Sequence, residues 1–358
     1  MKSDKSIKHT DHHHDEHQLM VLLTRVSQLD LNAVQRAFSV PLDWNYIYET
    51  ACLLGVAPLF YYHLRDLRPA GLQGTPLINS FKTQYHLVMA NNLYLGHELD
   101  KISEKLAGHG ISCIGLKGMV LSRTIYPSPA LRPMFDIDIL VRSEDLHGVH
   151  EIIKGLGYHP DKKDFPAGAC KYQYHAHYFK ESASPVILEV HWGLGEKNRY
   201  DINEAGIWAR AQKSPYGPYL EMSDDDTLLY LSLHFFKHFL FKRLSWLCDI
   251  HEWVCLREIH WDRVVERAQA QSIATFLACT LIILERFYQM TLPVRTEEIL
   301  RIGPVRKNIL DWYLRKYDMF HPMTENRWPI KRLFAFTCID RMPDRLKFTW
   351  DVLRRDMQ

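Results

Sequence analysis

Two aspartates separated by one residue are the strongest chemical signal in this sequence. Asp136 and Asp138 belong to the stretch Asp-Ile-Asp-Ile-Leu-Val, which predicts a strand over residues 136–141. Side chains alternate across a strand, so both carboxylates are expected on the same face. Neighbouring carboxylates repel each other and are stable together when a cation lies between them. The pair therefore predicts a divalent-metal site.

A glycine turn upstream predicts a phosphate site beside the metal site. The segment Gly115–Met119 joins a short apolar run to a helix expected over Met119–Tyr126. Gly118 would let backbone N–H groups approach a phosphate closely, and Lys117 could reach the phosphate oxygens as a point charge. Arg132, in a proline-rich loop before the aspartates, would either neutralise a carboxylate or hold a triphosphate. A phosphate site next to a metal site indicates phosphoryl or nucleotidyl transfer.

A third carboxylate is expected from a later strand. Glu189 is a charged residue inside the otherwise apolar segment 186–192, Val-Ile-Leu-Glu-Val-His-Trp. It would either lie on an exposed sheet face, pair with an arginine, or join the two aspartates at the metal. Two-metal nucleotidyl transfer commonly needs a carboxylate from a neighbouring strand, which favours the metal role. His191 shares the face of Glu189 and is expected to bind substrate or to orient the carboxylate.

A second histidine-based metal site is less favoured by the sequence. His234 and His238 lie four residues apart on one expected helix face, but the glutamate of a His-Glu-x-x-His motif is absent. We interpret them as core or interface histidines, with a contribution to the active-site cleft as the alternative.

The composition narrows the class of protein. The 358 residues include 44 Lys plus Arg against 42 Asp plus Glu, a formal net charge of +2. This balance argues against DNA as a partner and makes an RNA acceptor less favoured. The seven cysteines are scattered singly, which is typical of a reducing compartment, and no apolar run approaches the length of a membrane span. We expect a cytoplasmic protein without a membrane partner.

The distribution of helical and strand patterns predicts an α+β fold. Strands expected near 111–116, 136–141, 174–180 and 185–192 would form a small mixed β-sheet, because the last two are separated by a short polar turn and pair antiparallel. Helical periodicity dominates on both sides. The predicted organisation is a disordered histidine-rich tail (1–17), an N-terminal helical region (18–110), a nucleotidyltransferase-like α/β core (111–202) and a C-terminal helical region (203–358).

Three of these motifs together resemble a known family. Leu116-Lys117-Gly118, the segment Arg132–Val141 with its Arg-Pro-x-x-Asp-x-Asp-x-Leu-Val pattern, and Glu189-Val190-His191-Trp192 are similar to elements of a bacterial nucleotidyltransferase-like family. That family is placed in the DNA polymerase beta-like nucleotidyltransferase superfamily. Members of the superfamily often have Gly-Ser at the turn, where the serine helps to hold the triphosphate, whereas Met119 follows Gly118 here.

The resemblance implies an activity and a site. It implies Mg²⁺, with Mn²⁺ as an alternative, held by Asp136, Asp138 and Glu189, and transfer of a nucleoside monophosphate from a nucleoside triphosphate. Lys117, Gly118, Arg132 and His191 would bind the nucleotide. The acceptor, a hydroxyl or phosphate on a small molecule, peptide or protein, is left open. The alternatives are a catalytically inactive protein that binds a nucleotide or a partner, and a toxin-like enzyme that modifies RNA.

Overall fold

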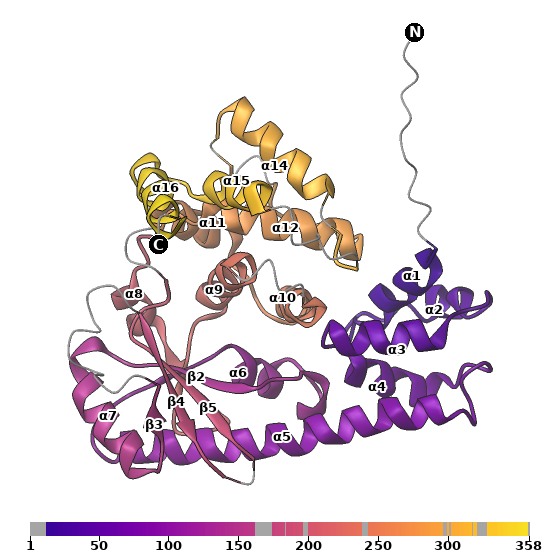
Figure 1. The fold of residues 1–358 in the computed structure, drawn as a ribbon, viewed down its shortest axis with the longest axis horizontal. Coiled ribbons are helices and arrows are strands. Elements are labelled where there is room, and N and C mark those ends of the chain that lie inside the picture. Colours follow the sequence, from indigo (N-terminus) through magenta and orange to yellow (C-terminus); the bar gives the residue numbers. More distant parts are fainter. Residues whose placement is uncertain are drawn as a thin grey trace.

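The structure is a mixed α+β fold, as the sequence predicts. The computed structural model describes residues 12–161, 174–182, 184–195, 200–237, 243–295, 299–300, 302–316, 318–320 and 328–356. A single mixed sheet lies between a long helix on one side and a group of C-terminal helices on the other (Figure 1). Of the helices in the described residues, none is both long and apolar enough to cross a membrane.

Helices make up the N-terminal region up to residue 107. Their bounds are α1 (His14–Leu23), α2 (Leu31–Ala37), α3 (Trp44–Leu53), α4 (Ala57–Leu67) and α5 (Pro76–Ala107). Asp30 and Asp43 accept hydrogen bonds from the first backbone N–H groups of α2 and α3, which explains where those helices begin.

The start of α1 corrects the predicted tail. This helix begins at His14, so the last residues of the segment predicted as disordered (1–17) are helical. His17 is buried, contacts the Tyr46 hydroxyl at 2.6 Å and stacks on Phe320. These contacts attach the end of the histidine-rich segment to the helical core, and residues 1–11 lie outside the described residues.

The sheet has seven strands in the order β3-β4-β5-β2-β1-β7-β6. Their bounds are β1 (Ile114–Leu116), β2 (Asp136–Leu140), β3 (His159–Pro160), β4 (His175–Lys180), β5 (Val186–His191), β6 (Gln212–Lys213) and β7 (Leu220–Glu221). Strands β2 and β5 pair in parallel, whereas β1 with β2 and β4 with β5 pair antiparallel. The antiparallel pairing of the two later strands is therefore confirmed. Strands β6 and β7 lie beyond residue 202, where the sequence placed the end of the core.

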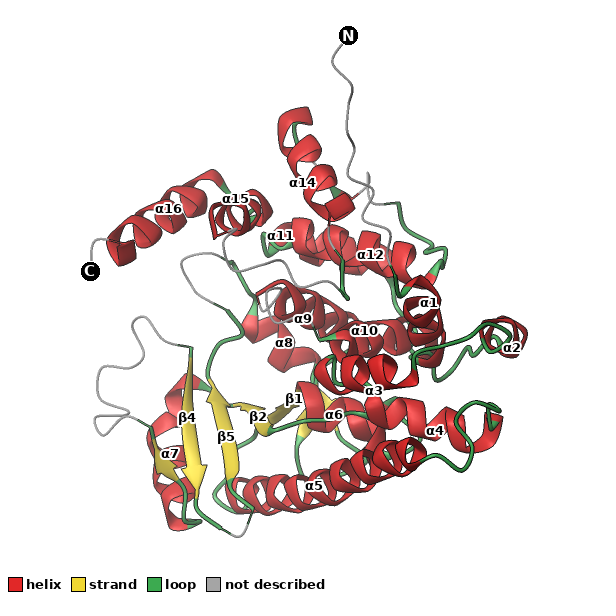
Figure 2. Ribbon diagram, turned by 45° about the vertical axis from the view of Figure 1, so that its right-hand side comes forward, coloured by secondary structure: helices red, strands yellow, loops and turns green. Residues whose placement is uncertain are grey.

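One face of the sheet is apolar and covered by helices. Ile137 and Ile139 of β2 and Leu188 and Val190 of β5 are fully buried on this face. They pack in one cluster with α5 and with α7 (Leu146–Gly155). Helix α5 offers Leu95, Leu99, Ile102 and Leu106, spaced so that they share one helical face. The helix continues past the sheet beneath α4, and thus joins the two halves of the molecule (Figure 2).

The C-terminal helices cover part of the opposite face. Their bounds are α8 (Glu204–Arg210), α9 (Asp224–Lys237), α10 (Leu244–Leu256), α11 (Trp261–Ala270), α12 (Ala274–Tyr288), α14 (Pro304–Lys316), α15 (Trp328–Cys338) and α16 (Met342–Asp356). Helices α9 to α12 share one apolar core with α1, α3 and α4. The buried Glu252 of α10 accepts hydrogen bonds from the backbone N–H groups of Val26 and Ser27, at 2.9 and 3.0 Å. The N-terminal and C-terminal helical regions are therefore packed together, although the sheet separates them in sequence.

Candidate active site

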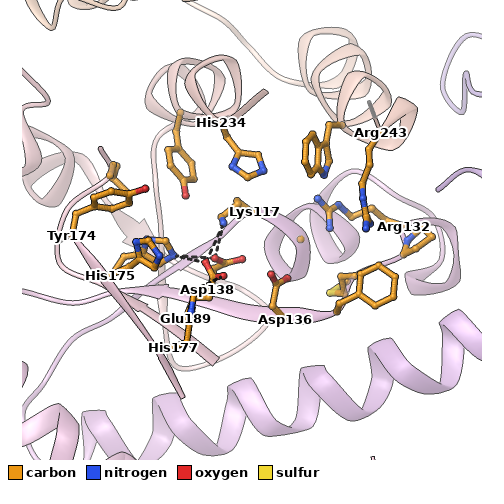
Figure 3. Close-up of a pocket in the computed structure, with 18 residues that line it drawn as sticks. Lys117, Arg132, Asp136, Asp138, Tyr174, His175, His177, Glu189, His234 and Arg243 are labelled. Carbon is orange, nitrogen blue, oxygen red and sulfur yellow. Dashed lines mark hydrogen bonds and ion pairs between the residues drawn. The ribbon is translucent and has the colours of Figure 1, made fainter. Parts of the chain in front are cut away.

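A pocket of about 390 Å³ opens on the polar face of the sheet, between β2, β4 and β5 below and helices α9 and α10 above (Figure 3). It contains all seven residues that the sequence assigned to the metal and nucleotide sites. The residues that line it are Lys117, Gly118, Arg132, Pro133, Met134, Phe135, Asp136, Asp138, Tyr174, His175, His177, Glu189, His191, Leu194, Tyr230, His234, Arg243 and Trp246.

Sheet register places polar side chains from three strands in one row. Asp138 of β2 is the direct partner of Glu189 on β5, and Glu189 is the direct partner of His177 on β4. Residues paired across neighbouring strands point to the same face and lie about 5 Å apart. Asp136 precedes Asp138 by two residues, so it faces the same pocket.

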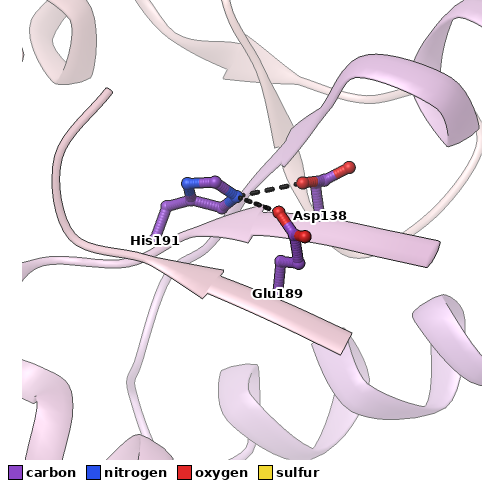
Figure 4. A group of neighbouring side chains, drawn as sticks. All are labelled: Asp138, Glu189 and His191. Carbon is purple, nitrogen blue, oxygen red and sulfur yellow. Dashed lines mark hydrogen bonds and ion pairs between the residues drawn. The ribbon is translucent and has the colours of Figure 1, made fainter. Parts of the chain in front are cut away.

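His191 connects the two nearest carboxylates. Its Nε2 atom lies 3.0 Å from Asp138 Oδ1 and 3.3 Å from Glu189 Oε2 (Figure 4). On the other side of Glu189, His177 Nε2 lies 3.1 Å from Oε1. Asp138, Glu189 and His191 each offer a ligand atom within 4.8 Å of the others, a spacing that could hold a metal ion. The predicted third carboxylate therefore lies beside Asp138, with histidines rather than an arginine as its neighbours.

Lys117 supplies the positive charge nearest to these carboxylates. Its Nζ atom is 2.6 Å from Asp138 Oδ1 and 3.7 Å from Glu189 Oε2. Helix α6 (Lys117–Thr124) begins directly at this residue, two positions earlier than predicted, because Leu116 of β1 already occupies the position before the helix. Lys117 has a φ of 45°, in the left-handed region that costs energy for a residue other than glycine. This backbone conformation turns the chain from the strand into the helix with the ammonium group over the carboxylates.

The electrostatics indicate an excess of negative charge. Burial, and then the neighbouring Asp138, raise the pKa of Asp136 to about 6. Burial alone would raise the pKa of Glu189, but hydrogen bonds from His177 and His191 and the charge of Lys117 hold that pKa well below its usual range. Burial opposes the charge of Lys117, yet Asp138 and the other surrounding acidic groups raise its pKa. The positive charge of Lys117 is thus shared among three carboxylates. Asp136 is the carboxylate whose charged form is disfavoured, as its raised pKa shows.

Arg132 has a different partner from the one considered in the sequence. Its Nε and Nη2 atoms donate to the carboxylate of Asp249 on α10 at 3.0 and 2.9 Å, and the Tyr126 hydroxyl donates to the same carboxylate at 2.9 Å. Arg132 and Asp249 are 7% and 1% exposed. The guanidinium packs so closely on Gly118 that a Cβ atom there would lie 2.4 Å from Nη1. Gly118 is therefore required by this arginine as well as by any ligand at the start of α6.

The structure adds residues that the sequence analysis did not select. His177 and Tyr174 on the β4 side and Arg243 and Trp246 on α10 or just before it complete the pocket wall. The alternation of His175 and His177 along β4 was a usable signal, because it places both on one face. No sequence pattern indicated that Arg243 lies at the pocket, because its position depends on how α10 packs over the sheet.

The histidine pair on α9 is only partly described. His234 lines the pocket and contacts the Trp246 ring edge-on, with ring centroids 4.9 Å apart. It therefore contributes to the cleft, one of the roles considered in the sequence. His238 lies outside the described residues.

Comparison with known families gives this geometry its context. Residues 41–289 match a family model described as an uncharacterised nucleotidyltransferase. This range is more than half of the chain. The chain belongs to this nucleotidyltransferase family. The matched range includes the strands and helices that carry the pocket residues, so membership supports a transferase whose general activity is nucleotidyl transfer. No curated protein matches the chain at a significant level.

Proposed function

We propose that this protein is a Mg²⁺-dependent enzyme that transfers a nucleoside monophosphate from a nucleoside triphosphate to an acceptor hydroxyl or phosphate. The acceptor belongs to a small molecule, a peptide or a protein. The observation that carries the proposal is the meeting of Asp136, Asp138 and Glu189, from two parallel strands, at one pocket in a nucleotidyltransferase family member. The DNA polymerase beta-like superfamily is the proposed origin of this arrangement.

The residues at the site fit a divalent cation. Three carboxylates face one lysine, and burial together with the neighbouring Asp138 raises the pKa of Asp136 to about 6, so a bound cation would favour its charged form. Asp138, Glu189 and His191 lie within ligand distance of one another, and Asp136 lines the same pocket. Asp136, Asp138 and Glu189 would hold Mg²⁺, and the imidazole of His191 makes Mn²⁺ an acceptable substitute. When bound, the cation neutralises charge on the phosphates and lowers the pKa of a coordinated hydroxyl.

The protein side chains have separate tasks in the transfer. Lys117 would contribute a positive charge beside the triphosphate, and the first backbone N–H groups of α6 at Gly118 would donate to its oxygens. Arg132 would add a guanidinium at the same end. His191 would fix Asp138 and Glu189 in position through its Nε2 atom.

Glu189 is the proposed base for an acceptor hydroxyl. The acceptor oxygen forms a bond to the α-phosphorus while the bond from that phosphorus to the β-phosphate oxygen breaks, and pyrophosphate leaves. His177, His191 and Lys117 hold the pKa of Glu189 low, so its carboxylate would accept the proton only of a hydroxyl acidified at the site and would pass it on to solvent. A phosphate acceptor needs no such proton transfer.

Label position tests the reaction class. Nucleoside triphosphates carrying ³²P at the α or the γ position would be incubated with Mg²⁺, the protein and pools of metabolites, peptides or proteins. The proposal predicts a labelled product from the α label only, and none with Asp138→Asn. Label from the γ position would indicate phosphoryl transfer instead. Binding of nucleotide without product from any pool would support the inactive binding protein.

A further inference from the structure

The pocket has two chemically different ends on either side of the carboxylates. Tyr174, His175 and His177 stand at one end, and Arg132 and Arg243 stand at the other, with Asp136 on the arginine side (Figure 3). The first end consists of aromatic and imidazole groups. The second carries two guanidinium groups, one from the loop before β2 and one from the residue that precedes α10. A two-substrate enzyme needs such a division, because each substrate must reach the metal from its own side.

Arg243 has no carboxylate partner among the described residues. Its guanidinium packs on the rings of Phe135 and Trp246, at 5.0 and 6.0 Å from the ring centroids. Stacking on ring faces holds a guanidinium in place and leaves its N–H groups directed outward. Phe135 is 63% exposed, which is unusual for a phenylalanine and shows that this wall faces open space. Arg243 is therefore held in a fixed orientation at the pocket wall without an ion-pair partner in the described part of the chain, which suits it to bind an anionic ligand.

Arg132 also retains donor capacity toward the pocket. The Nε and Nη2 atoms of Arg132 donate hydrogen bonds to Asp249. Its Nη1 atom forms no hydrogen bond within the described residues and packs against Gly118. Burial, and then the charge of Arg132, lower the pKa of Arg243, so the two guanidinium groups repel each other. Of these two arginines, Asp249 forms an ion pair with Arg132 alone, while the charge of Asp136 acts on both arginines without an ion pair to either. A ligand with several negative charges would remove the repulsion.

We propose that Arg243 and Arg132 together bind the β- and γ-phosphates of the nucleoside triphosphate, with the start of α6 at Gly118 beside them. The acceptor is then bound at the opposite end, near Tyr174 and His177. This inference rests on the proposed function and adds to it a binding residue from the C-terminal helices and a direction for each substrate.

Inorganic tripolyphosphate is the probe that isolates this site, because it lacks a base and a sugar. Calorimetric titrations would compare tripolyphosphate, ATP, GTP, CTP, UTP and adenosine on the full-length protein, its Arg243→Gln and Arg243→Lys variants and an Arg36→Gln control. Arg36 is exposed on α2, far from the pocket residues in sequence. One charge-assisted contact is worth about a tenfold change in affinity.

The expected result is a loss of about tenfold in tripolyphosphate and triphosphate affinity for Arg243→Gln, with a smaller loss for Arg243→Lys. Arg36→Gln should behave as the wild type, and tripolyphosphate should compete with the nucleotide. Unchanged affinities in Arg243→Gln, or simultaneous binding of tripolyphosphate and nucleotide, would overturn the inference. Absence of triphosphate binding by the wild type would instead count against the proposed function itself, so the two failures are distinguishable.

Discussion

The molecule contains two clusters of buried charge that lie close together but differ in their balance. In the first, one carboxylate, Asp249, meets one guanidinium, Arg132, and one hydroxyl, from Tyr126. In the second, Asp136, Asp138 and Glu189 share the single ammonium group of Lys117, with histidines around them. The first cluster joins the sheet to α10 and is buried, with only Arg132 reaching the pocket wall, whereas the carboxylates of the second line a pocket that opens to solvent.

The difference separates a balanced ion pair, which anchors α10 to the sheet, from a group of carboxylates that lacks matching positive charge. A buried charge without compensation is costly, so a cluster that serves only the fold is expected to balance itself. In the Arg132–Asp249 cluster one positive charge meets one negative charge. In the carboxylate cluster three carboxylates share one lysine. The imbalance falls on the side chains to which the proposed function assigns the transfer, and functional sites are where local instability is expected. The variants below test each side of this contrast.

The largest effect is expected for Asp138→Asn. Asp138 contacts both Lys117 and His191 and is the direct strand partner of Glu189. Loss of its charge should lower the rate of nucleotidyl transfer by about a thousandfold or more, because in the proposed reaction this carboxylate would hold the cation beside the transferring phosphate. Labelled transfer from the α position measures this. The thermal unfolding curve should change little, and retained activity in a folded variant would refute the assignment of Asp138.

Asp249→Ala should affect stability first. It leaves Arg132 buried without its partner, which costs about 3–5 kcal/mol in the free energy of unfolding. Urea denaturation followed by circular dichroism measures the change. Asp262, exposed near the start of α11, provides the control, and its alanine variant should lose less than about 1 kcal/mol. Equal losses in the two variants would contradict a structural role for the Arg132–Asp249 pair.

Asp136→Asn should stabilise the metal-free protein while it impairs transfer. The pKa of Asp136 is raised from 3.8 to about 6, so its charged form is disfavoured in the fold, by at most about 3 kcal/mol and less because the side chain is partly exposed. The wild type has its full stability below pH 3.8 and loses this contribution as the pH rises through about 6. The gain in melting temperature of the variant over the wild type, measured with a chelator, should therefore be absent near pH 3.8 and largest above pH 6. A gain independent of pH would show that charge is not its cause.

Gly118→Ala should have a smaller effect than the variants above and should lower both the stability of the protein and its affinity for tripolyphosphate. The added Cβ atom would lie 2.4 Å from Arg132 Nη1, so the guanidinium must shift, at a cost of about 1–3 kcal/mol. Chemical denaturation and tripolyphosphate titration measure the two consequences. Gly155 on α7 has no atom within 4 Å of the same position, and its alanine variant is the matched control. Identical behaviour of the two variants would show that the close packing on Gly118 is unimportant.

Sequence patterns were sufficient where the chemistry follows local periodicity. Alternation along β2 and β5 placed Asp136, Asp138, Glu189 and His191 on their faces, and the apolar character of both strands predicted that they lie inside a sheet. The long helix α5 was also evident, because it contains no internal proline after its first position and ends beside Gly108.

Contacts between distant segments could not be predicted in the same way. Asp249 and Arg243 meet the site through the packing of α10 over the sheet, and no local pattern records that packing. Strands β6 and β7 are two residues long, too short for a period to show. The beginning of α1 was missed because its histidines and acidic residues look like a polar tail until Tyr46 and Phe320 bury them.

Divalent-cation binding is the most direct test of the contrast between the two clusters. Mn²⁺ would be titrated into the wild type and Asp138→Asn in the presence of a non-hydrolysable triphosphate, with free Mn²⁺ followed by its paramagnetic resonance signal. The account predicts saturable binding to the wild type, displaced by Mg²⁺, and affinity weakened at least about tenfold in Asp138→Asn. Equal binding by the two proteins, or none by the wild type, would contradict the claim that the three carboxylates form a metal site.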